Sequence, residues 1–247
     1  MEAENVMERA HRALQRVYPR ARVAQPDPKH WHENRIVLPQ ERGPAVNAYR
    51  MLRTQVLRQA RALQARTIGI VSAADGEGKT LTAVNLALSL AAEPNQTVLL
   101  VDLDLHRPGV ARLFDLPAEQ GLEDWLAGSG PIAGRFWRIQ GIERLSILPA
   151  VVPVSGSSEL LAGAPIKELL QDLKSRYEDR LVVIDLPPAL LSDAVLTVAP
   201  LLDAVLVVGC EGRTRREDLT RLREVLSGVR LLGTVLNCAS EFERRAY

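Results

Sequence analysis

The sequence predicts an α/β fold: a mostly parallel, doubly wound sheet with helices on both faces, preceded by a helical or irregular N-terminal extension. From residue 67 onward, short apolar runs alternate with segments of helical periodicity. The runs are almost continuously apolar, which is typical of strands buried on both faces of a parallel sheet. Several of them lead directly into glycine-rich or acidic segments, as expected at the edge where such sheets bind ligands.

Six apolar runs are the predicted strands. They are Ile68–Val71, Val98–Val101, Leu145–Leu148, Leu181–Ile184, Ala204–Val208 and Leu231–Leu236. The chain has 247 residues, of which 47% are hydrophobic, and this supports one full core with a small appendage. The two cysteines, Cys210 and Cys238, each end a predicted strand, and we expect both to be small buried residues in a reducing compartment.

Residues 1–44 are predicted to form a basic extension and linker, and residues 45–247 the main domain. Apolar groups recur at helical spacing over residues 3–17, whereas the proline-rich segment 19–44 is expected to resist helix formation and to be extended or mobile. Within that segment His30 and His32 lie two apart without a third ligand, so we do not expect a metal site there.

Charge is distributed unevenly along the chain. Residues 1–66 contain 13 Lys and Arg against 6 Asp and Glu, whereas residues 67–247 contain 18 against 24. The basic end suits an anionic membrane surface, an acidic partner segment or the acidic half of a neighbouring copy, unless it is simply a solvated helix. Neither a signal-like leader nor an apolar run of bilayer length is present, so we expect a soluble, cytoplasmic protein.

The segment Ser72–Thr80 (SAADGEGKT) follows an apolar run and precedes a helix-like run. This layout is that of a phosphate-binding P-loop, in which backbone N–H groups and a helix N-terminus hold a polyphosphate. Lys79 would reach the β- and γ-phosphates, and the Thr80 hydroxyl would bind Mg²⁺. Ala73 stands where the motif usually has its first glycine. A turn that caps a helix is the alternative, but the flanking strand and helix favour nucleotide binding.

Acidic residues follow two further predicted strands. Asp102 and Asp104 come after Val98–Val101, and Asp185 comes after Leu181–Ile184. Beside a P-loop such carboxylates can hold Mg²⁺ or accept a proton from an attacking hydroxyl. On a regular strand Asp102 and Asp104 would face the same way. Each could instead cap a helix or a turn, but three acids at one sheet edge with a P-loop favour a metal site.

With these motifs in order, the chain resembles the bacterial tyrosine autokinases of capsule and exopolysaccharide synthesis, a branch of the ParA/MinD-like P-loop ATPases. The resemblance covers roughly residues 45–240. It rests on Ala48–Arg53, Ser72–Thr80, Val98–Pro108, Arg112–Phe114, Gly121–Leu122, Leu126–Gly128, Glu159–Leu161 and Asp185–Pro188. As in the kinases, the signature lysine of ParA and MinD is missing, because Ala74 stands in its place.

The resemblance implies ATP and Mg²⁺ as cofactors and roles for individual residues. Nucleotide-binding residues would be Asp75, Gly76, Glu77, Gly78, Lys79, Thr80, Leu81 and Asn237. Asn237 would touch adenine, although an Asn that ends a strand is as typical of a turn. Metal ligands would be Thr80, Asp104 and Asp185. Asp102 would be the base for an incoming tyrosine hydroxyl, with Lys79 as the other catalytic residue.

The resemblance also implies assembly. A predicted helix, residues 45–64, carries Arg50 and Arg53 in a segment similar to the family's oligomerisation helix, so a homo-oligomer is expected. The family further implies an activating membrane adaptor of the polysaccharide co-polymerase type, and recruitment to the inner face of the membrane. The apolar stripe of this basic helix argues for packing, so we expect no nucleic-acid partner.

Three positions depart from the family pattern. His106 replaces the usual arginine of the second acidic motif, although Arg107 follows it, and Asn47 replaces the glutamate that starts the oligomerisation motif. Relatives carry a cluster of tail tyrosines, whereas this tail has one, Tyr247, as the candidate phosphoacceptor or a bystander. The leading hypothesis is therefore an ATP-dependent tyrosine autokinase. The alternatives are a partner-gated ATPase switch without kinase activity, and an ATP-sensing scaffold without hydrolysis.

Overall fold

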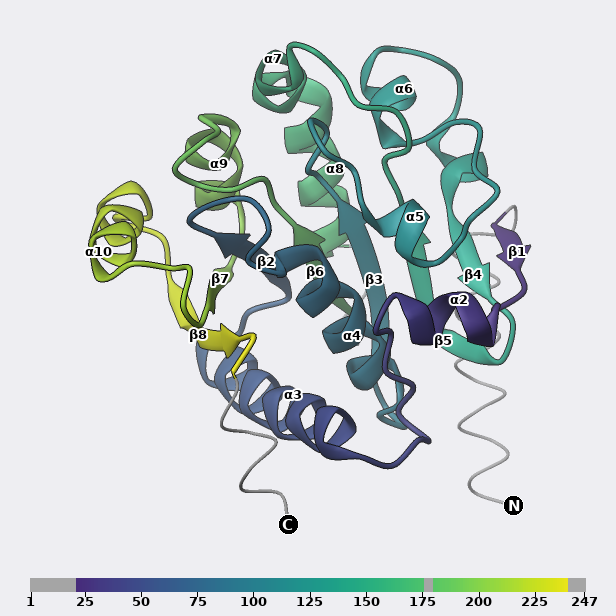
Figure 1. Ribbon diagram of the computed structural model, residues 1–247. Helices are drawn as coiled ribbons and strands as arrows, with labels where there is room; N and C mark the ends of the chain where they lie inside the picture. The colour runs from purple at the N-terminus through teal and green to yellow at the C-terminus, as the bar shows by residue number, and fades with distance from the viewer. Residues whose placement is uncertain (1–20, 176–179, 240–247) are drawn as a thin grey trace.

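The computed structural model describes residues 21–175 and 180–239. Over these residues eight strands form a single sheet in the order β1-β4-β5-β3-β6-β2-β7-β8 (Figure 1). The strands are β1 (Arg22–Ala24), β2 (Thr67–Ser72), β3 (Thr97–Asp102), β4 (Trp137–Ile139), β5 (Ile142–Leu148), β6 (Arg180–Asp185), β7 (Ala204–Cys210) and β8 (Leu231–Asn237). All neighbours are parallel except β4 and β5. The predicted fold class and all six predicted strands are confirmed.

Helices cover both faces of the sheet (Figure 1). They are α2 (Pro28–Glu33), α3 (Pro44–Leu63), α4 (Lys79–Ala91), α5 (Val110–Leu113), α6 (Leu122–Leu126), α7 (Ser157–Ala162), α8 (Ala164–Ser175), α9 (Ala194–Val198) and α10 (Arg216–Val225), with short 3₁₀ turns at Ile132–Arg135 and Ala199–Leu201. One core lies between the sheet and α2–α5, and the other between the sheet and α6–α10. Successive β3 residues alternate between them, Leu99 in one core and Leu100 in the other.

The described part of the N-terminal linker is ordered against the sheet, so the expectation of a helix-free segment is wrong. β1 pairs with β4, and Asp27 caps α2 by accepting N–H bonds from Lys29 and His30. Trp31 on α2 is 2% exposed and packs edge-on against Phe114, with ring centroids 5.6 Å apart. A proline at the first helical position favours the start of a helix and does not break it. The prolines of this segment were therefore a poor guide to the absence of a helix.

Of the remaining expectations, the structure confirms some and contradicts one, and others fall outside the described residues. The predicted helix at residues 45–64 is α3, which buries Val46, Val56 and Ala60. The predicted helix at residues 3–17 and Tyr247 lie outside the described residues. Within the described ranges, no helix combines the length and apolarity needed to cross a membrane. Cys210 is buried as expected, but the expectation is wrong for Cys238, which is exposed.

Candidate nucleotide and metal site

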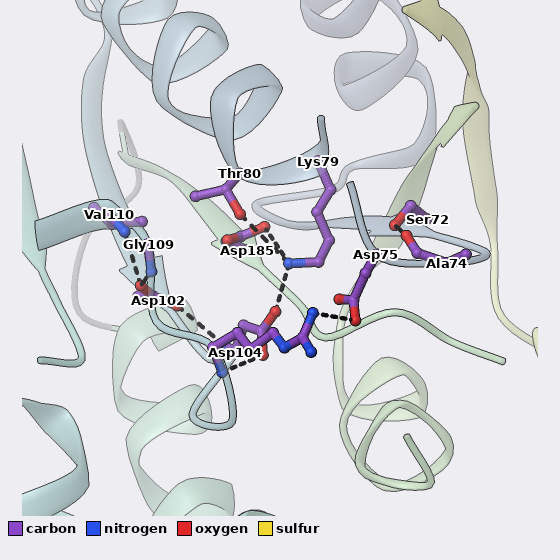
Figure 2. A network of polar contacts seen from close by, with 11 residues as sticks. Ser72, Ala74, Asp75, Lys79, Thr80, Asp102, Asp104, Gly109, Val110 and Asp185 are labelled. Atoms are coloured by element: carbon purple, nitrogen blue, oxygen red, sulfur yellow. Dashed lines mark hydrogen bonds and ion pairs between the residues drawn. The ribbon is translucent and has the colours of Figure 1, made fainter. Parts of the chain in front are cut away.

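The predicted P-loop joins β2, which ends at Ser72, to α4, which begins at Lys79 (Figure 2). Two glycines adopt left-handed backbone conformations in it, Gly76 with φ +73° and Gly78 with φ +88°. At Gly78 a Cβ would also lie 2.0 Å from the Asn237 Nδ2 atom. The loop therefore needs glycine here both for its turn and for the close approach of the β8 end.

Lys79 is the centre of a buried polar cluster (Figure 2). Its Nζ lies 2.5 Å from Asp104 Oδ2, 3.8 Å from Asp185 Oδ1 and 3.4 Å from the Thr80 hydroxyl. Burial opposes the ammonium charge, but Asp185 and Asp104 outweigh it, so the pKa of Lys79 is raised and the side chain stays cationic. The predicted metal ligands and the predicted phosphate-binding lysine therefore meet in one place.

Asp185 has the most unusual environment of the cluster. It is 0% exposed, and neither carboxylate oxygen accepts a hydrogen bond. Burial raises its pKa to about 6, although the Lys79 charge acts in the opposite direction. A buried carboxylate whose oxygens face only the longer contact to Lys79, 3.8 Å from Oδ1, fits a cation ligand. In the described ranges, no group of three His, Cys, Asp or Glu is spaced to hold a metal.

Asp102 faces a different way from Asp104, contrary to the expectation for a regular strand. β3 ends at Asp102, so the alternation of side chains does not continue to Asp104. Asp102 Oδ2 accepts N–H bonds from Gly109 and Val110, both 3.0 Å long, and Oδ1 accepts the Asp104 N–H at 3.1 Å. Burial and the charge of Asp185 raise its pKa, against these bonds. In this conformation Asp102 fixes the loop that follows β3.

The side chain of Glu77 points into the protein and stabilises the conformation of the P-loop. One of its oxygens accepts the Ala74 N–H at 2.8 Å, and the other accepts the Thr214 hydroxyl. The carbonyl of Glu77 accepts a bond from Asn237 Nδ2 at 3.0 Å. Of the residues predicted to bind nucleotide, Glu77 therefore acts on the loop's shape, and Asn237 lies against the loop from the end of β8.

Two residues that the sequence did not indicate complete this support. Arg213, on the turn after β7, donates from Nη1 to the Gly76 carbonyl at 3.0 Å. Its neighbour Thr214 links Glu77 to the Cys210 N–H, which it accepts at 2.7 Å. Both lie 137 residues from their P-loop partners, so no local pattern could have indicated them. The one feature that could have indicated them is that Arg213 and Thr214 follow β7, a strand that pairs with β2.

A polar hollow of about 280 Å³ opens beside the Lys79 cluster. Its lining includes Asp75, Asp104, His106 and Arg107, from the loops that follow β2 and β3, and Ser157 and Ser158, at the start of α7. Arg107 Nη1 pairs with Asp75 Oδ2 at 2.7 Å, which ties the P-loop to the segment after β3. The hollow leads from the surface to Asp104, whereas Asp102 is not part of its wall.

A second hollow, of about 550 Å³, lies on the other side of the P-loop, between α3 and the end of β8. Its walls are largely apolar and include Ala45, Tyr49, Leu52 and Thr82, with Asn237 at one side. A flat aromatic base with an edge of donors and acceptors suits an apolar hollow beside an amide. This is the place where the predicted adenine contact of Asn237 could be made.

The two arginines predicted to serve oligomerisation bond within the chain. Arg50 Nη2 donates to the Pro39 carbonyl at 2.7 Å. Arg53 donates to the Ser89 carbonyl at 3.2 Å and pairs with Glu93 at 2.9 Å. Contact with a second copy through these guanidinium groups would have to share or replace these bonds.

Comparisons with known proteins agree with this geometry. The family model that matches, described as ParA, NUBPL iron-transfer P-loop NTPase, covers residues 64–242. The chain is 29% identical over 191 residues to the tyrosine-protein kinase YwqD of Bacillus subtilis (strain 168), covering 76% of this chain and 79% of YwqD. It is also 29% identical over 209 residues to the succinoglycan biosynthesis transport protein ExoP of Rhizobium meliloti (strain 1021), covering 83% of this chain and 26% of ExoP.

A solved structure gives the same picture. The kinase domain of VpsO matches with a TM-score of 0.71 and 30% sequence identity, over 80% of this chain and 96% of that one.

Proposed function

Because the chain belongs to the ParA-like P-loop NTPases, in the branch of the bacterial tyrosine-protein kinases, we propose that it transfers the γ-phosphate of Mg·ATP to tyrosine in capsule or exopolysaccharide synthesis. One observation carries the proposal: a buried lysine at the start of α4 lies within 4 Å of two buried carboxylates, at 2.5 Å and 3.8 Å. Such a cluster is costly to keep without a ligand and suits a metal-bound polyphosphate.

The loop between β2 and α4 would hold the phosphates. Its N–H groups and the N-terminus of α4, a helix of 13 residues, supply positive partial charge. Lys79 would exchange part of its contact with Asp104 for the phosphate oxygens. Thr80, Asp104 and Asp185 would hold Mg²⁺, which when bound neutralises charge on the transferred phosphoryl group. Asp75, Gly76, Gly78 and Leu81 would line the phosphate path, and Asn237 would meet the base.

Two carboxylates compete for the role of proton acceptor. Asp102 is the predicted base, and burial and the Asp185 charge raise its pKa, which makes it a stronger base, but it would have to release the Gly109 and Val110 N–H groups. Asp104 already faces the polar hollow through which an acceptor tyrosine would enter. We propose that Asp102 accepts the proton once the loop after β3 has moved, and that Asp104 positions the metal.

The acceptor tyrosine would enter the hollow lined by His106, Arg107 and Ser158. Tyr247 is the candidate acceptor, supplied by the same chain or by a second copy. The basic N-terminal part, with 13 Lys and Arg against 6 Asp and Glu over residues 1–66, would favour the inner face of a membrane. An adaptor of the polysaccharide co-polymerase type would be the partner there.

The test is incubation of the full chain with labelled ATP and Mg²⁺, followed by mapping of the label. We expect phosphate on tyrosine, lost in Tyr247→Phe if the tail is the acceptor. Asp102→Asn should lower transfer while leaving Mg·ADP affinity within about threefold, whereas Asp104→Asn should weaken both. Hydrolysis without any labelled tyrosine would contradict kinase activity and support the ATPase switch, an alternative that the comparisons do not favour. Nucleotide binding without turnover would support the non-hydrolysing scaffold.

A further inference from the structure

The two cysteines of the chain, Cys210 and Cys238, lie side by side at the border of the nucleotide site. Cys210 ends β7, and Cys238 directly follows the neighbouring parallel strand β8, whose last residue, Asn237, lies opposite Cys210 in the register. The Cys210 thiol donates to the Glu211 carbonyl at 3.6 Å, and Cys238 lies close enough to raise the pKa of that thiol. Cys238 has a φ of +59°, a conformation uncommon for residues other than glycine, so the side-chain alternation of β8 does not continue through it.

The two thiols differ in accessibility. Cys210 is 2% exposed, whereas Cys238 is exposed. Burial and the neighbouring Cys238 raise the pKa of the Cys210 thiol to about 11, so at neutral pH it is a weak nucleophile on its own. An oxidant from solution would therefore meet Cys238 first, and Cys210 would be the nearby second thiol.

Both cysteines are joined to the supports of the P-loop. The Cys210 N–H donates to the Thr214 hydroxyl, which in turn donates to the Glu77 carboxylate. Cys238 directly follows Asn237, whose side-chain amide donates to the Glu77 carbonyl. A covalent link between the strand ends would act on both of these supports at once.

We propose that Cys210 and Cys238 form an intramolecular disulfide with hydrogen peroxide as oxidant, and that this bond weakens nucleotide binding. The Cys238 thiolate attacks the peroxide O–O bond, which gives a sulfenic acid and releases one water. The Cys210 sulfur then attacks the Cys238 sulfur, the S–O bond breaks, and a second water leaves. The two sulfurs lose two electrons in total, and hydrogen peroxide is reduced to two waters. The effect on nucleotide binding rests on the proposed function, whereas the formation of the disulfide does not.

A disulfide has strict geometry, with χ₃ near ±90° and a Cα separation of about 4.4–6.8 Å. Closing it would pull the left-handed Cys238 backbone toward Cys210 and shift Asn237, its neighbour. Asn237 occupies the space beside Gly78 and borders the hollow proposed for the base. We therefore expect the oxidised form to bind Mg·ADP at least fivefold more weakly than the reduced form.

The experiment treats the reduced full chain with hydrogen peroxide and measures intact mass, cross-linked peptides and Mg·ADP affinity by calorimetry. The expected result is a monomer that has lost two hydrogens, a Cys210–Cys238 peptide pair, and weakened affinity that dithiothreitol restores. Cys238→Ser should not respond to peroxide, whereas Cys210→Ser should stop at a sulfenic acid that a dimedone probe traps. Each variant's own reduced form is its reference.

Other outcomes would overturn the proposal in distinguishable ways. Disulfides that only join two copies, or an equal peroxide response in Cys238→Ser, would refute the intramolecular bond. A complete internal disulfide with unchanged Mg·ADP affinity would refute its effect on the site. If the reduced chain bound no nucleotide, the proposed function would fail with that effect, while the mass data would still decide whether the disulfide forms.

Discussion

Asp185 and Asp203 are the same residue type at opposite edges of one sheet, and their surroundings are opposite as well. Asp185 ends β6 at the carboxyl edge, where its Oδ1 lies 3.8 Å from the Lys79 ammonium and neither oxygen accepts a hydrogen bond of ordinary length. Asp203 precedes β7 at the amino edge. Its Oδ2 accepts bonds of 2.9 Å from the N–H groups of Arg66 and Thr67 and from the Thr67 hydroxyl, and its Oδ1 pairs with Lys174 at 2.8 Å.

The pKa values record the difference. Burial raises the pKa of Asp185 to about 6 despite the Lys79 charge. Burial also acts to raise the pKa of Asp203, but the bonds from Lys174 and from the backbone of Arg66 and Thr67 outweigh it, and the pKa is lowered. One edge of the sheet therefore uses a carboxylate to hold the fold together, whereas the other keeps a carboxylate at a cost to stability, which is what a ligand site requires.

The largest expected effect is on the lysine of the site. Lys79→Met should lower tyrosine phosphorylation and ATP hydrolysis by at least about 1,000-fold, because Lys79 is the buried cation at the start of α4, whereas Arg107 and Arg213 are bonded to Asp75 and to the Gly76 carbonyl. Lys174→Met, the matched control at the amino edge, should leave both rates within about twofold. It should lower the free energy of unfolding by no more than about 1 kcal/mol, since Lys174 is partly exposed. Equal losses of activity in the two variants would contradict the comparison.

The next effect separates binding from stability. Asp185→Asn should weaken Mg·ATP affinity by about 100-fold. It should nevertheless raise the free energy of unfolding of the ligand-free chain by about 1–3 kcal/mol, because the raised pKa of Asp185 means that its charge is unfavourable in the folded state, and Lys79 keeps Asp104 as a partner. Asp203→Asn should do the reverse: unchanged affinity, and a loss of about 2–3 kcal/mol from the weakened carboxylate bonds to Arg66, Thr67 and Lys174. Calorimetry and urea unfolding measure the two quantities. A lower free energy of unfolding in Asp185→Asn would refute the proposal that the Asp185 charge destabilises the ligand-free chain.

pH should distinguish the same two carboxylates through stability. The Asp185 pKa is raised from 3.8 to about 6, so its penalty is absent below pH 4, grows between pH 4 and 6, and is complete above pH 6. The Asp203 pKa is lowered from 3.8, so its contribution is complete above that value and is lost as pH falls through the lower folded pKa. As the pH falls from 6 to 4, the difference in free energy of unfolding between wild type and Asp185→Asn should therefore vanish. The corresponding difference for Asp203→Asn should persist. Urea unfolding at several pH values measures these differences. If both differences changed with pH in the same way, the two carboxylates would not have the environments described here.

The sequence could predict the carboxyl edge because its residues act through local patterns. The glycine-rich loop, the acids after apolar runs and the six long strands are each visible within about ten residues. The amino edge could not be predicted in this way, because Asp203 acts on Thr67, 136 residues away. β1 and β4, with three residues each, are too short for a periodic signal. The exposure of Cys238 depends on one left-handed residue that no neighbouring residue signals.

The smallest expected effect tests the long-range support of the P-loop. Arg213→Ala removes the bond from Nη1 to the Gly76 carbonyl, 3.0 Å long on an exposed surface. Because the loop keeps its Glu77 and Asn237 bonds, we expect Mg·ADP affinity to fall by only about three- to tenfold, with stability changed by less than about 0.5 kcal/mol. Arg215→Ala, two residues further on at the N-cap of α10, is the control and should leave affinity unchanged. Calorimetry on both variants decides the matter, since equal affinities would mean that Arg213 contributes no support to the loop.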